Sequence, residues 1–386
     1  MIHVCIVSCQ HSPDDVRVTH KEAMSFRQAG FRVTWVGPRR LRKGDDYGVD
    51  FRYYPLGIGR VGRLLHYRQA RRVALSVDDV DVFFAVEPDS AVVASHLARR
   101  YRAAAIFDIH EIYHDEMLGR WAKGVFRKLL SECVRRSILK TCRRCDSVVA
   151  VSDATMAPYA SVSTPHIIVR NCAPVSFADG GASDVCSPSR EHFTVMHGKF
   201  AHERGTEAVL RAAAMAAQSV PNLRLVMFEG SSEQFQADSS PESLKLISQH
   251  GARNVVDLRP TVPMHEMTGI LRTCDAGLIA YDRTWGIRSL PNRLFEYMAA
   301  GLPVIAPVYA DEIRKIVERE RCGLLVDCEQ PADIAAAFVH LQKNPAEAIE
   351  MGRRGLEAFL SRHNWEVEVK PLVQRIRELA ANRQAR

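Results

Sequence analysis

Strand-like and helix-like runs alternate along almost the whole chain, and no other feature constrains the fold as much. The opening reads "HVCIVSC", then "RVTHKEAMSFRQAG", then "FRVTWVG", which predicts a strand, a helix ended by Gly30, and a second strand. Further strand-like runs follow at "VDVFFAV", "AAIFDI" and "SVVAVS". Because repeated strand–helix–strand units are typical of parallel, doubly wound sheets, we predict an α/β fold of this class.

The alternation is interrupted near residue 171 and then resumes, which predicts two domains. The segment "NCAPVSFADGGASDVCSPSRE" is rich in Gly, Ser, Pro and Asp, so we expect residues 172–192 to be an interdomain linker. Strand-like runs return at "HFTVMHG", "NLRLVMFEG", "VVDLRP", "DAGLIAY" and "LPVIAP". A chain of 386 residues also exceeds what one core usually supports. We expect residues 1–171 to form one Rossmann-like domain, facing a second across a cleft that suits an elongated nucleotide ligand.

The stretch "DIHEIYHDE", Asp108 to Glu116, contains His-Glu-x-x-His, the pattern of a zinc metalloprotease helix. Zinc binding would require His110 and His114 one turn apart on a continuous helix, with a distant third ligand such as Glu132. The preceding apolar run "AAAIFDI" favours a strand instead. We therefore expect His110 just past the carboxyl end of a buried strand, where parallel sheets bind ligands, and we predict no metal site.

The composition, 47% hydrophobic and 25% charged, is typical of a soluble globular protein, and no apolar run is long enough for a membrane span. The amino terminus "MIHVCIVSC" lacks the features of a signal peptide, and ten cysteines in such a chain are best interpreted as reduced thiols. Cys142 and Cys145 form a C-x-x-C without a second pair, so we interpret them as ordinary thiols. The expected location is the cytoplasm.

The net charge of +7 is unevenly placed, and much of it lies between residues 121 and 145. Helical spacing predicts an apolar face made of Phe126, Leu130, Cys133 and Ser137. The basic face consists of Arg136, Lys140, Arg143 and Arg144. A solvated outer face is the simplest interpretation, and contact with an anionic membrane surface is the alternative. Nucleic acid is not an expected partner, because the aromatic residues are not interleaved with the basic ones.

The most informative stretch is "SLPNRLFEYMAAGLPVIAP", Ser289 to Pro307. Proline in the first turn and Gly301 as a stop predict a helix that begins near Pro291. Because this helix follows a predicted strand, its amino-terminal N–H groups should face a ligand, and a diphosphate is the anion we expect there. Glu296, further along the helix, is placed to accept two hydrogen bonds from a ribose diol.

At this point the sequence resembles the retaining glycosyltransferases of family 4, which have the two-domain GT-B fold and use nucleotide-activated sugars. The resemblance runs nearly end to end. Its opening is "PDDVRVTHKEAMSFRQAGFRVTWVG", its basic element is "GKFAHERGTEAVLRAA", and the elements before the donor helix are "NVVDLRPTVPMHEMTGILRTCDAGLIAYD". "HNWEVEVKPLVQRIREL" resembles the family's last helix, which crosses back to the first domain. The resemblance thus implies a donor domain at 193–364 and a returning helix at 365–386.

The resemblance also implies roles for individual residues. Lys199 and Arg204 correspond to the two cations that hold the donor diphosphate, and His110 corresponds to the histidine that contacts the donor sugar. The other expected donor-binding positions are Arg288, Leu290, Asn292 and Glu296. At Arg288 the chain departs from the family pattern, which has a glutamate there, and this puts the sugar contacts of that glutamate in doubt.

The function implied is transfer of a sugar, with retention, from a nucleotide sugar to a hydroxyl acceptor. A lipid-linked or saccharide acceptor in envelope or exopolysaccharide biosynthesis, at the inner membrane face, is the family's commonest setting. Lys199, Arg204 and the N–H groups near Asn292 would stabilise charge on the departing diphosphate, and no metal or other cofactor is expected. Two alternatives remain: a catalytically silent GT-B protein, which Arg288 favours, and a sugar-nucleotide epimerase of the same fold.

Overall fold

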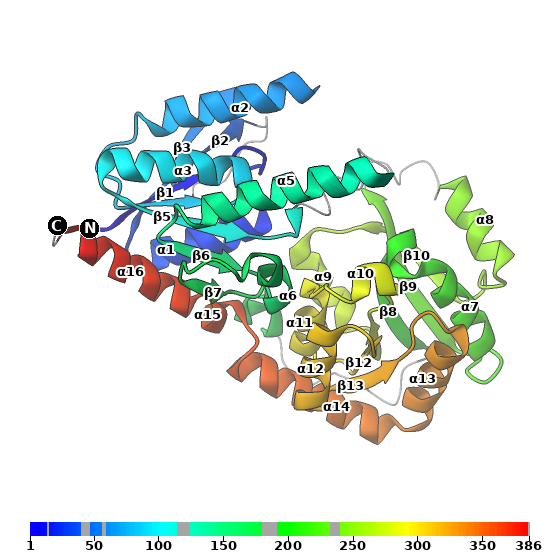
Figure 1. The fold of residues 1–386 in the computed structure, drawn as a ribbon. Helices are drawn as coiled ribbons and strands as arrows, with labels where there is room; N and C mark the ends of the chain where they lie inside the picture. Colours follow the sequence, from blue (N-terminus) through cyan, green and yellow to red (C-terminus); the bar gives the residue numbers. More distant parts are fainter. Residues whose placement is uncertain are drawn as a thin grey trace. The chain divides into compact units, whose positions relative to one another are not determined.

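The structure is a computed structural model of the 386-residue chain, and it describes residues 1–13, 15–39, 47–55, 59–113, 124–179, 191–231 and 240–384. The chain forms two compact units (Figure 1). Unit 1 consists of Met1–Asn171 together with Trp365–Arg386, and unit 2 consists of Cys172–Asn364. Each unit has a parallel sheet flanked by helices, which confirms the predicted doubly wound α/β class.

Unit 1 is built on a seven-stranded sheet in the order β3-β2-β1-β4-β5-β6-β7. Its strands are β1 (His3–Val7), β2 (Arg32–Arg39), β3 (Asp50–Pro55), β4 (Val82–Ala85), β5 (Ala104–Ile109), β6 (Ser147–Ala150) and β7 (His166–Ile168). Every pairing is parallel, and Val4 lies opposite both Val33 and Val82. The strand order reverses between β1 and β4, and such a switch point is where open parallel sheets bind ligands.

Alternate side chains of β1 enter two different apolar cores, one on each face of this sheet. Cys5 and Val7 pack in one core, and Val4 and Ile6 pack in the other. The helices that cover the two faces are η1 (Val16–Ala23), α1 (Met24–Gln28), α2 (Gly59–Ala74), α3 (Pro88–Tyr101), α5 (Gly124–Cys142), α6 (Asp153–Met156) and η2 (Ala157–Tyr159). Of these, η1 is a π-helix, a form that is rare and frequent at functional sites.

The segment after unit 2 returns to unit 1 as α15 (Trp365–Glu368) and α16 (Lys370–Gln384), shown in red in Figure 1. Trp365, Leu372 and Ile376 are buried in the same core as Val4. The indole Nε1 of Trp365 donates to Ser25 Oγ at 2.8 Å, which satisfies its one buried polar group. The last helix is therefore an integral part of unit 1.

The predicted apolar face of α5 is wrong. Cys133 and Ser137 are exposed, Leu130 is 41% exposed, and the side chain of Phe126 lies outside the described residues. The helix instead buries Ile138, Leu139 and Cys142, because these positions contact the core beneath the helix. Its outer surface therefore combines exposed leucines with basic residues. Within the described ranges, no helix has both the length and the apolarity needed to cross a bilayer.

Unit 2 contains a six-stranded sheet in the order β10-β9-β8-β11-β12-β13. Its strands are β8 (Phe193–Lys199), β9 (Leu223–Ser231), β10 (Val256–Thr261), β11 (Ala276–Leu278), β12 (Val304–Pro307) and β13 (Gly323–Val326). The surrounding helices are η3 (Val175–Ala178), η5 (His202–Arg204), α7 (Thr206–Ala216), α8 (Pro241–Gln249), α9 (Met264–Leu271), α10 (Arg283–Gly286), α11 (Asn292–Ala299), α12 (Asp311–Glu320), α13 (Pro331–Lys343) and α14 (Pro345–Ser361). The strand order reverses between β8 and β11, so a ligand-binding edge is also expected here.

The segment expected to be a linker, residues 172–192, contributes to unit 2 at its start. Cys172, Ala173 and Phe177 are buried in the core of unit 2, so this part of the segment is packed structure. Residues 180–190 lie outside the described ranges.

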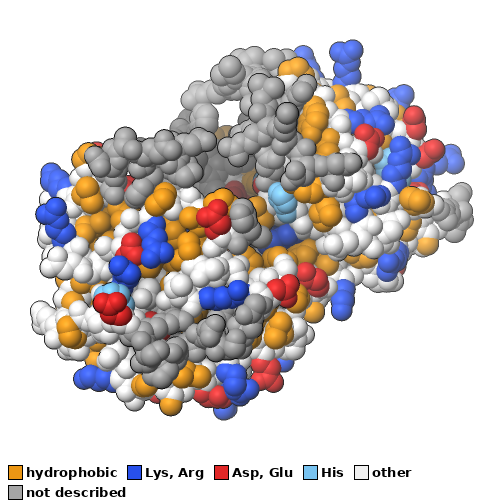
Figure 2. Space-filling view, turned by 180° about the vertical axis from the view of Figure 1, so that it is seen from behind, with side chains coloured by type: hydrophobic (Ala, Val, Ile, Leu, Met, Phe, Trp, Pro, Cys, Tyr) orange, Lys and Arg blue, Asp and Glu red, His pale blue; other side chains and the backbone are white. Residues whose placement is uncertain are grey.

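On the face of the molecule in Figure 2, the coloured Lys and Arg side chains are interspersed with Asp and Glu and form no continuous basic patch.

Candidate active site

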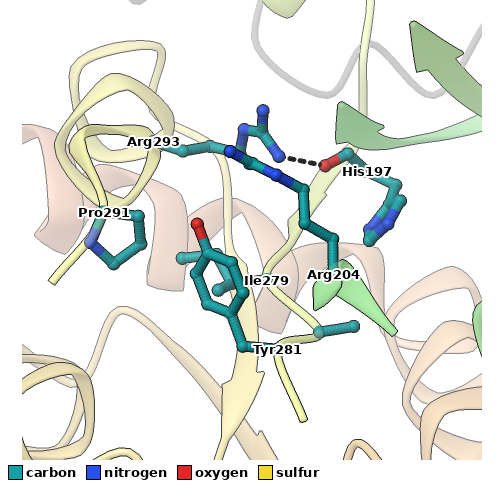
Figure 3. Close-up of a pocket in the computed structure, with 7 residues that line it drawn as sticks. His197, Arg204, Ile279, Tyr281, Pro291 and Arg293 are labelled. Carbon is teal, nitrogen blue, oxygen red and sulfur yellow. Dashed lines mark hydrogen bonds between the residues drawn. The ribbon is translucent and has the colours of Figure 1, made fainter. Parts of the chain in front are cut away.

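A small cavity lies at the switch point of the unit 2 sheet, where β8 and β11 end (Figure 3). Its volume is about 10 Å³, enough for one water molecule. The residues that line it are His197, Arg204, Ile279, Ala280, Tyr281, Pro291 and Arg293. They come from β8, from η5, from the segment after β11 and from the start of α11, so four separate chain segments meet here.

Two arginine side chains reach this cavity, and each is held by an uncharged partner. Arg293 Nη1 donates to the His197 carbonyl oxygen at 2.5 Å (Figure 3). The Arg204 guanidinium lies over the Tyr281 ring, 5.5 Å from its centre. Among the described residues, no carboxylate forms an ion pair with either arginine. The cavity therefore carries uncompensated positive charge, as an anion site requires.

Gly198 explains how Arg293 reaches its position. Its φ of +95° is one that residues with a side chain rarely adopt, and a Cβ atom there would lie 2.2 Å from Arg293 Cζ. The register of β8 against β9 also shifts between Met196 and Gly198. The end of this strand is thus shaped so that the guanidinium can lie against the backbone.

His197 lines the same cavity as the two arginines and is buried, with 1% of its surface exposed. Neither ring nitrogen has a hydrogen-bond partner among the residues that the structure describes. Burial, followed by the positive charges of Arg293 and Arg204, lowers the pKa of His197 to about 3. The imidazole is therefore neutral at physiological pH, and it leaves the positive charge of the site to the arginines.

The amino end of α11 contributes backbone donors beside the cavity. Pro291 precedes the first helical residue, Asn292, and no described side chain caps the helix, so the N–H groups of Asn292 and Arg293 are available to a ligand. The Leu290 side chain is partly buried and packs against the core of unit 2. Glu296 is partly buried on the next turn of the same helix, and Arg288 is exposed in the loop before it.

Lys199 does not line the cavity. It is the last residue of β8 and its side chain is exposed. Of the two cations expected to hold the diphosphate, Arg204 lines the cavity and Lys199 does not. The second cation that lines it is Arg293, which sequence reasoning missed. A signal was present, because a cation in the first turn of a helix opposes the helix dipole unless an anion binds there.

His110 lies in unit 1, immediately after β5, at the predicted position past the end of a buried strand. Its Nε2 is 2.5 Å from Asp108 Oδ2, and Asp108 is fully buried. Arg17 donates to both carboxylate oxygens of Asp108, with N–O distances of 3.1 and 3.2 Å. Burial alone would raise the pKa of Asp108, but Arg17 and His110 outweigh it and hold that pKa well below its usual range.

Glu22 completes this buried group and bears on metal binding. Glu22, Asp108 and His110 are the described residues whose potential ligand atoms cluster within 4.8 Å of one another. Burial raises the pKa of Glu22 well above its usual value, and the Asp108 carboxylate raises it further. Arg17 already lies 3.1 Å from a Glu22 carboxyl oxygen and balances Asp108. A metal ion at this cluster would therefore encounter a protonated Glu22 and the Arg17 guanidinium rather than free carboxylates.

The zinc interpretation meets a structural obstacle. His110 follows a strand and not a helix, so the continuous helix that the motif requires does not include it. His114 lies outside the described residues. Glu132 on α5 is paired with Arg135 and Arg136, at 2.7 and 2.8 Å.

Cys142 and Cys145 are free, buried thiols in the core of unit 1.

Two family models match consecutive parts of the chain. The model described as Glycosyltransferase Family 4 covers residues 16–169, and the model described as Glycosyl transferases group 1 covers residues 184–357. Curated relatives include D-inositol 3-phosphate glycosyltransferases of Pseudarthrobacter chlorophenolicus, 28% identical over 40% of this chain and 36% of the relative, and of an Arthrobacter species, 29% identical over 43% and 38%. These matches span less than half the length of the relatives.

Solved structures match over nearly the full chain. Sucrose-phosphate synthase from Thermosynechococcus elongatus has a TM-score of 0.77 at 16% identity, covering 99% of this chain and 100% of that one. Anabaena HepE, solved in complex with UDP-glucose, has a TM-score of 0.72 at 14% identity, with 99% and 100% coverage. Fold and family models together define a glycosyltransferase enzyme with the GT-B fold. The chain belongs to glycosyltransferase family 4.

Proposed function

We propose that this enzyme transfers a sugar, with retention of configuration, from a nucleoside-diphosphate sugar to a hydroxyl group of a lipid-linked or saccharide acceptor. The observation that carries the proposal is the pair Arg204 and Arg293, which line one cavity beside the amino end of α11 without a carboxylate partner among the described residues. Two guanidinium groups and free helix N–H groups form a site for a diphosphate. The UDP and UDP-glucose complexes of Anabaena HepE support a nucleotide-sugar donor.

Catalysis in this proposal is electrostatic. As the bond between sugar and phosphate lengthens, negative charge grows on the departing diphosphate, and fixed cations stabilise it without rearranging. Arg204, Arg293 and Lys199 supply these cations, and Asn292 supplies a backbone N–H group. Glu296 holds the ribose, and His110 contacts the sugar. No metal ion takes part.

The acceptor part of the proposal rests on α5. This helix exposes Leu129 and Leu130 and, further along, the basic residues Arg136 and Lys140. A surface of this kind binds the interface of an anionic bilayer. We propose that the enzyme works in the cytoplasm as a peripheral protein of the inner membrane face, in a pathway that builds an envelope glycan or exopolysaccharide.

The proposal is tested by incubating the enzyme with a panel of nucleotide sugars, with and without a membrane lipid fraction, and measuring nucleotide release and the anomeric configuration of the product. Release coupled to a new glycoside with retained configuration is expected. His110→Ala should lower the rate, and a chelator should leave it unchanged. Donor binding without turnover, epimerised donor, or an inverted product would each contradict the proposal.

A further inference from the structure

A second histidine shares the carboxyl edge of the unit 1 sheet with His110. His11 lies in the loop after β1, and His110 follows β5. The two imidazole rings meet edge to face, with centres 5.5 Å apart and planes at 64°. Both strands border the switch-point strand β4, so the pair lies where this sheet is expected to bind a ligand.

The ring of His11 is fixed by Asp15. Nδ1 of His11 lies 2.9 Å from Asp15 Oδ2, and the other oxygen of Asp15 accepts from the Val18 amide at 2.8 Å and so caps η1. Burial alone would raise the pKa of Asp15, but the bonds from His11 and Val18 lower it to about 2. Because an ionised carboxylate only accepts, Nδ1 of His11 must carry the proton in this contact.

The backbone of His11 is fixed as well, by Glu87 after β4. Glu87 accepts hydrogen bonds from the hydroxyl of Ser8 at 2.7 Å and from the amides of Cys9, Gln10 and His11 at 3.0 to 3.1 Å. One buried carboxylate thus organises the whole loop. Its Oε1 is 3.8 Å from Nε2 of His11, too far for a hydrogen bond.

The two histidines consequently present different ring nitrogens to a ligand. The Nε2–H group of His110 donates a hydrogen bond to the ionised Asp108, so its Nδ1 is left for a ligand. The Nδ1–H group of His11 donates to Asp15, so its Nε2 is left for a ligand. Neither remaining nitrogen has a hydrogen-bond partner within the described ranges. His11 is 28% exposed and His110 is 12% exposed, so both can be reached.

The charge around the pair favours one donor and one acceptor. Burial alone would lower the pKa of His11, but its bond to Asp15 and the nearby Glu87 raise it, with Glu111 adding to the effect. On the other side Asp108 is balanced by Arg17. Nε2 of His11 is thus suited to donate and Nδ1 of His110 to accept. A hydroxyl group does both, so the pair matches hydroxyl chemistry and not a simple anion or cation.

We propose that His11 and His110 together form a hydroxyl-recognition site, in which His11 is a second residue that contacts a sugar or polyol substrate. The inference deepens the proposed function and rests on it. The hydroxyl belongs either to the sugar of the donor or to the acceptor, and the two sources predict different losses. Glu87 and Asp15 act through His11 as positioning residues.

The test compares wild type with His11→Ala and His11→Gln, using His96→Ala as a control because His96 is exposed on α3. If the hydroxyl is the donor's, His11→Ala should weaken UDP-glucose binding by about tenfold and leave UDP binding within about twofold. If it is the acceptor's, donor binding should stay unchanged, and KM for the acceptor should rise by about tenfold. In both cases His11→Gln, which keeps a hydrogen-bonding group, should retain more function than His11→Ala.

Two readouts keep the inference separate from the proposed function. Nitrogen-15 NMR of the histidine side chains should show the fully protonated form for His11, in which Nε2 can donate, and a bonded Nε2 proton for His110. Wild-type UDP binding and transfer activity test the proposed function alone. An active enzyme in which His11→Ala changes neither UDP-glucose affinity nor acceptor KM would overturn the inference.

Discussion

Contacts within the protein hold the Arg293 side chain in a position to bind an anion. Its guanidinium is fixed by a hydrogen bond to the His197 carbonyl and occupies space that a side chain at Gly198 would block. Arg204 brings a second positive charge to the same cavity. Two like charges near each other are unfavourable in the empty site, so a bound diphosphate gains from relieving the repulsion as well as from direct contact.

We predict that Arg293→Ala and Arg204→Ala each weaken UDP binding by on the order of 1.5 to 3 kcal/mol, or roughly tenfold to a hundredfold, because each removes a charged hydrogen-bonding partner. Lys199→Ala should have a similar effect, because we propose that Lys199 also supplies a cation to the diphosphate. Calorimetric titration with UDP measures the effect. Arg353→Ala is the control, since Arg353 is exposed on α14 and paired with Glu350. Wild-type affinity in all variants would refute the anion site.

A second prediction concerns the acid sensitivity of unit 2. His197 has a folded-state pKa of about 3, whereas an unfolded histidine titrates near its ordinary value of 6.5. Below pH 6.5 the unfolded chain therefore binds a proton that the folded chain rejects, and stability falls as the pH drops toward 3. His197→Gln should reduce this slope by up to about 1.4 kcal/mol per pH unit. Denaturant unfolding between pH 7 and pH 4 measures the slope, and parallel slopes for both proteins would contradict the assignment.

Arg288 supports a third prediction. It is exposed in the loop that precedes α11, where a cation is unfavourable unless an anion compensates it. We expect Arg288 to contact the distal phosphate of the donor or an acidic group on its sugar. Arg288→Ala should then weaken donor binding and flatten its salt dependence, and Arg288→Glu should change the preferred donor. Titrations at two ionic strengths decide: unchanged affinity and slope would leave Arg288 a surface residue.

At the scale of elements, most strands were predicted from their apolar runs, but β3, β7 and β13 were not. β5 reads "AAIFDI" and is fully buried, so its pattern was clear. β3 reads "DFRYYP", lies at the sheet edge and buries only Tyr54 completely, while β7 has three partly exposed residues. These strands exist because a neighbouring strand offers backbone partners, and a pattern of apolar residues does not record that.

The candidate site was predictable to a similar degree. Arg204 and His110 stand in motifs, but Arg293 gains its importance from the backbone of Gly198 and His197, which is a tertiary effect. The groups that orient His110 are equally difficult to identify from the sequence, because Arg17 and Asp108 are 91 residues apart. Short-range patterns identify residue types, whereas the partners that orient them depend on the fold.

The corrected face of α5 gives the fourth prediction. Leu129 is 63% exposed, and the basic residues Arg136 and Lys140 are exposed on the same helix. We expect the protein to bind vesicles of anionic phospholipid, and the double variant Arg136→Glu, Lys140→Glu to lose about 1 kcal/mol of binding for each basic residue removed. Co-sedimentation with vesicles measures this, with Arg353→Glu on α14 as the control. Equal binding to neutral and anionic vesicles would exclude the electrostatic part, and full binding by Leu129→Glu would exclude the apolar part.

At the scale of the whole molecule, the chain order of the two units matters. Unit 2 is inserted between Asn171 and Trp365 of unit 1, and unit 1 completes one of its two cores with Trp365, Val369, Leu372, Ile376 and Leu379. At about 1.5 to 3 kcal/mol for each buried apolar side chain, this segment contributes as much as the total stability of a typical domain, about 5 to 15 kcal/mol.

We therefore predict that deletion of residues 365–386 unfolds unit 1 and leaves unit 2 folded. Hydrogen exchange followed by mass spectrometry resolves the two units: amides of β1 and β5 should lose protection, and those of β8 and β12 should keep it. Lys370→Ala is the control, because Lys370 is exposed on α16. Retained protection in β1 and β5 after the deletion would show that unit 1 is stable without its last helix.

The same insertion has a consequence during protein synthesis. Domains usually fold in the order in which the ribosome makes them, but here residues 1–171 emerge first and cannot close their second core until Trp365 and the helix after it have been made. Unit 2 is contiguous and completes its fold earlier. At about 5 to 20 residues per second the delay is on the order of ten seconds or more, during which Phe26, Phe84 and Ile6 lack part of their cover. The nascent chain is thus expected to need a chaperone at its amino-terminal half, although that half is the first to be translated.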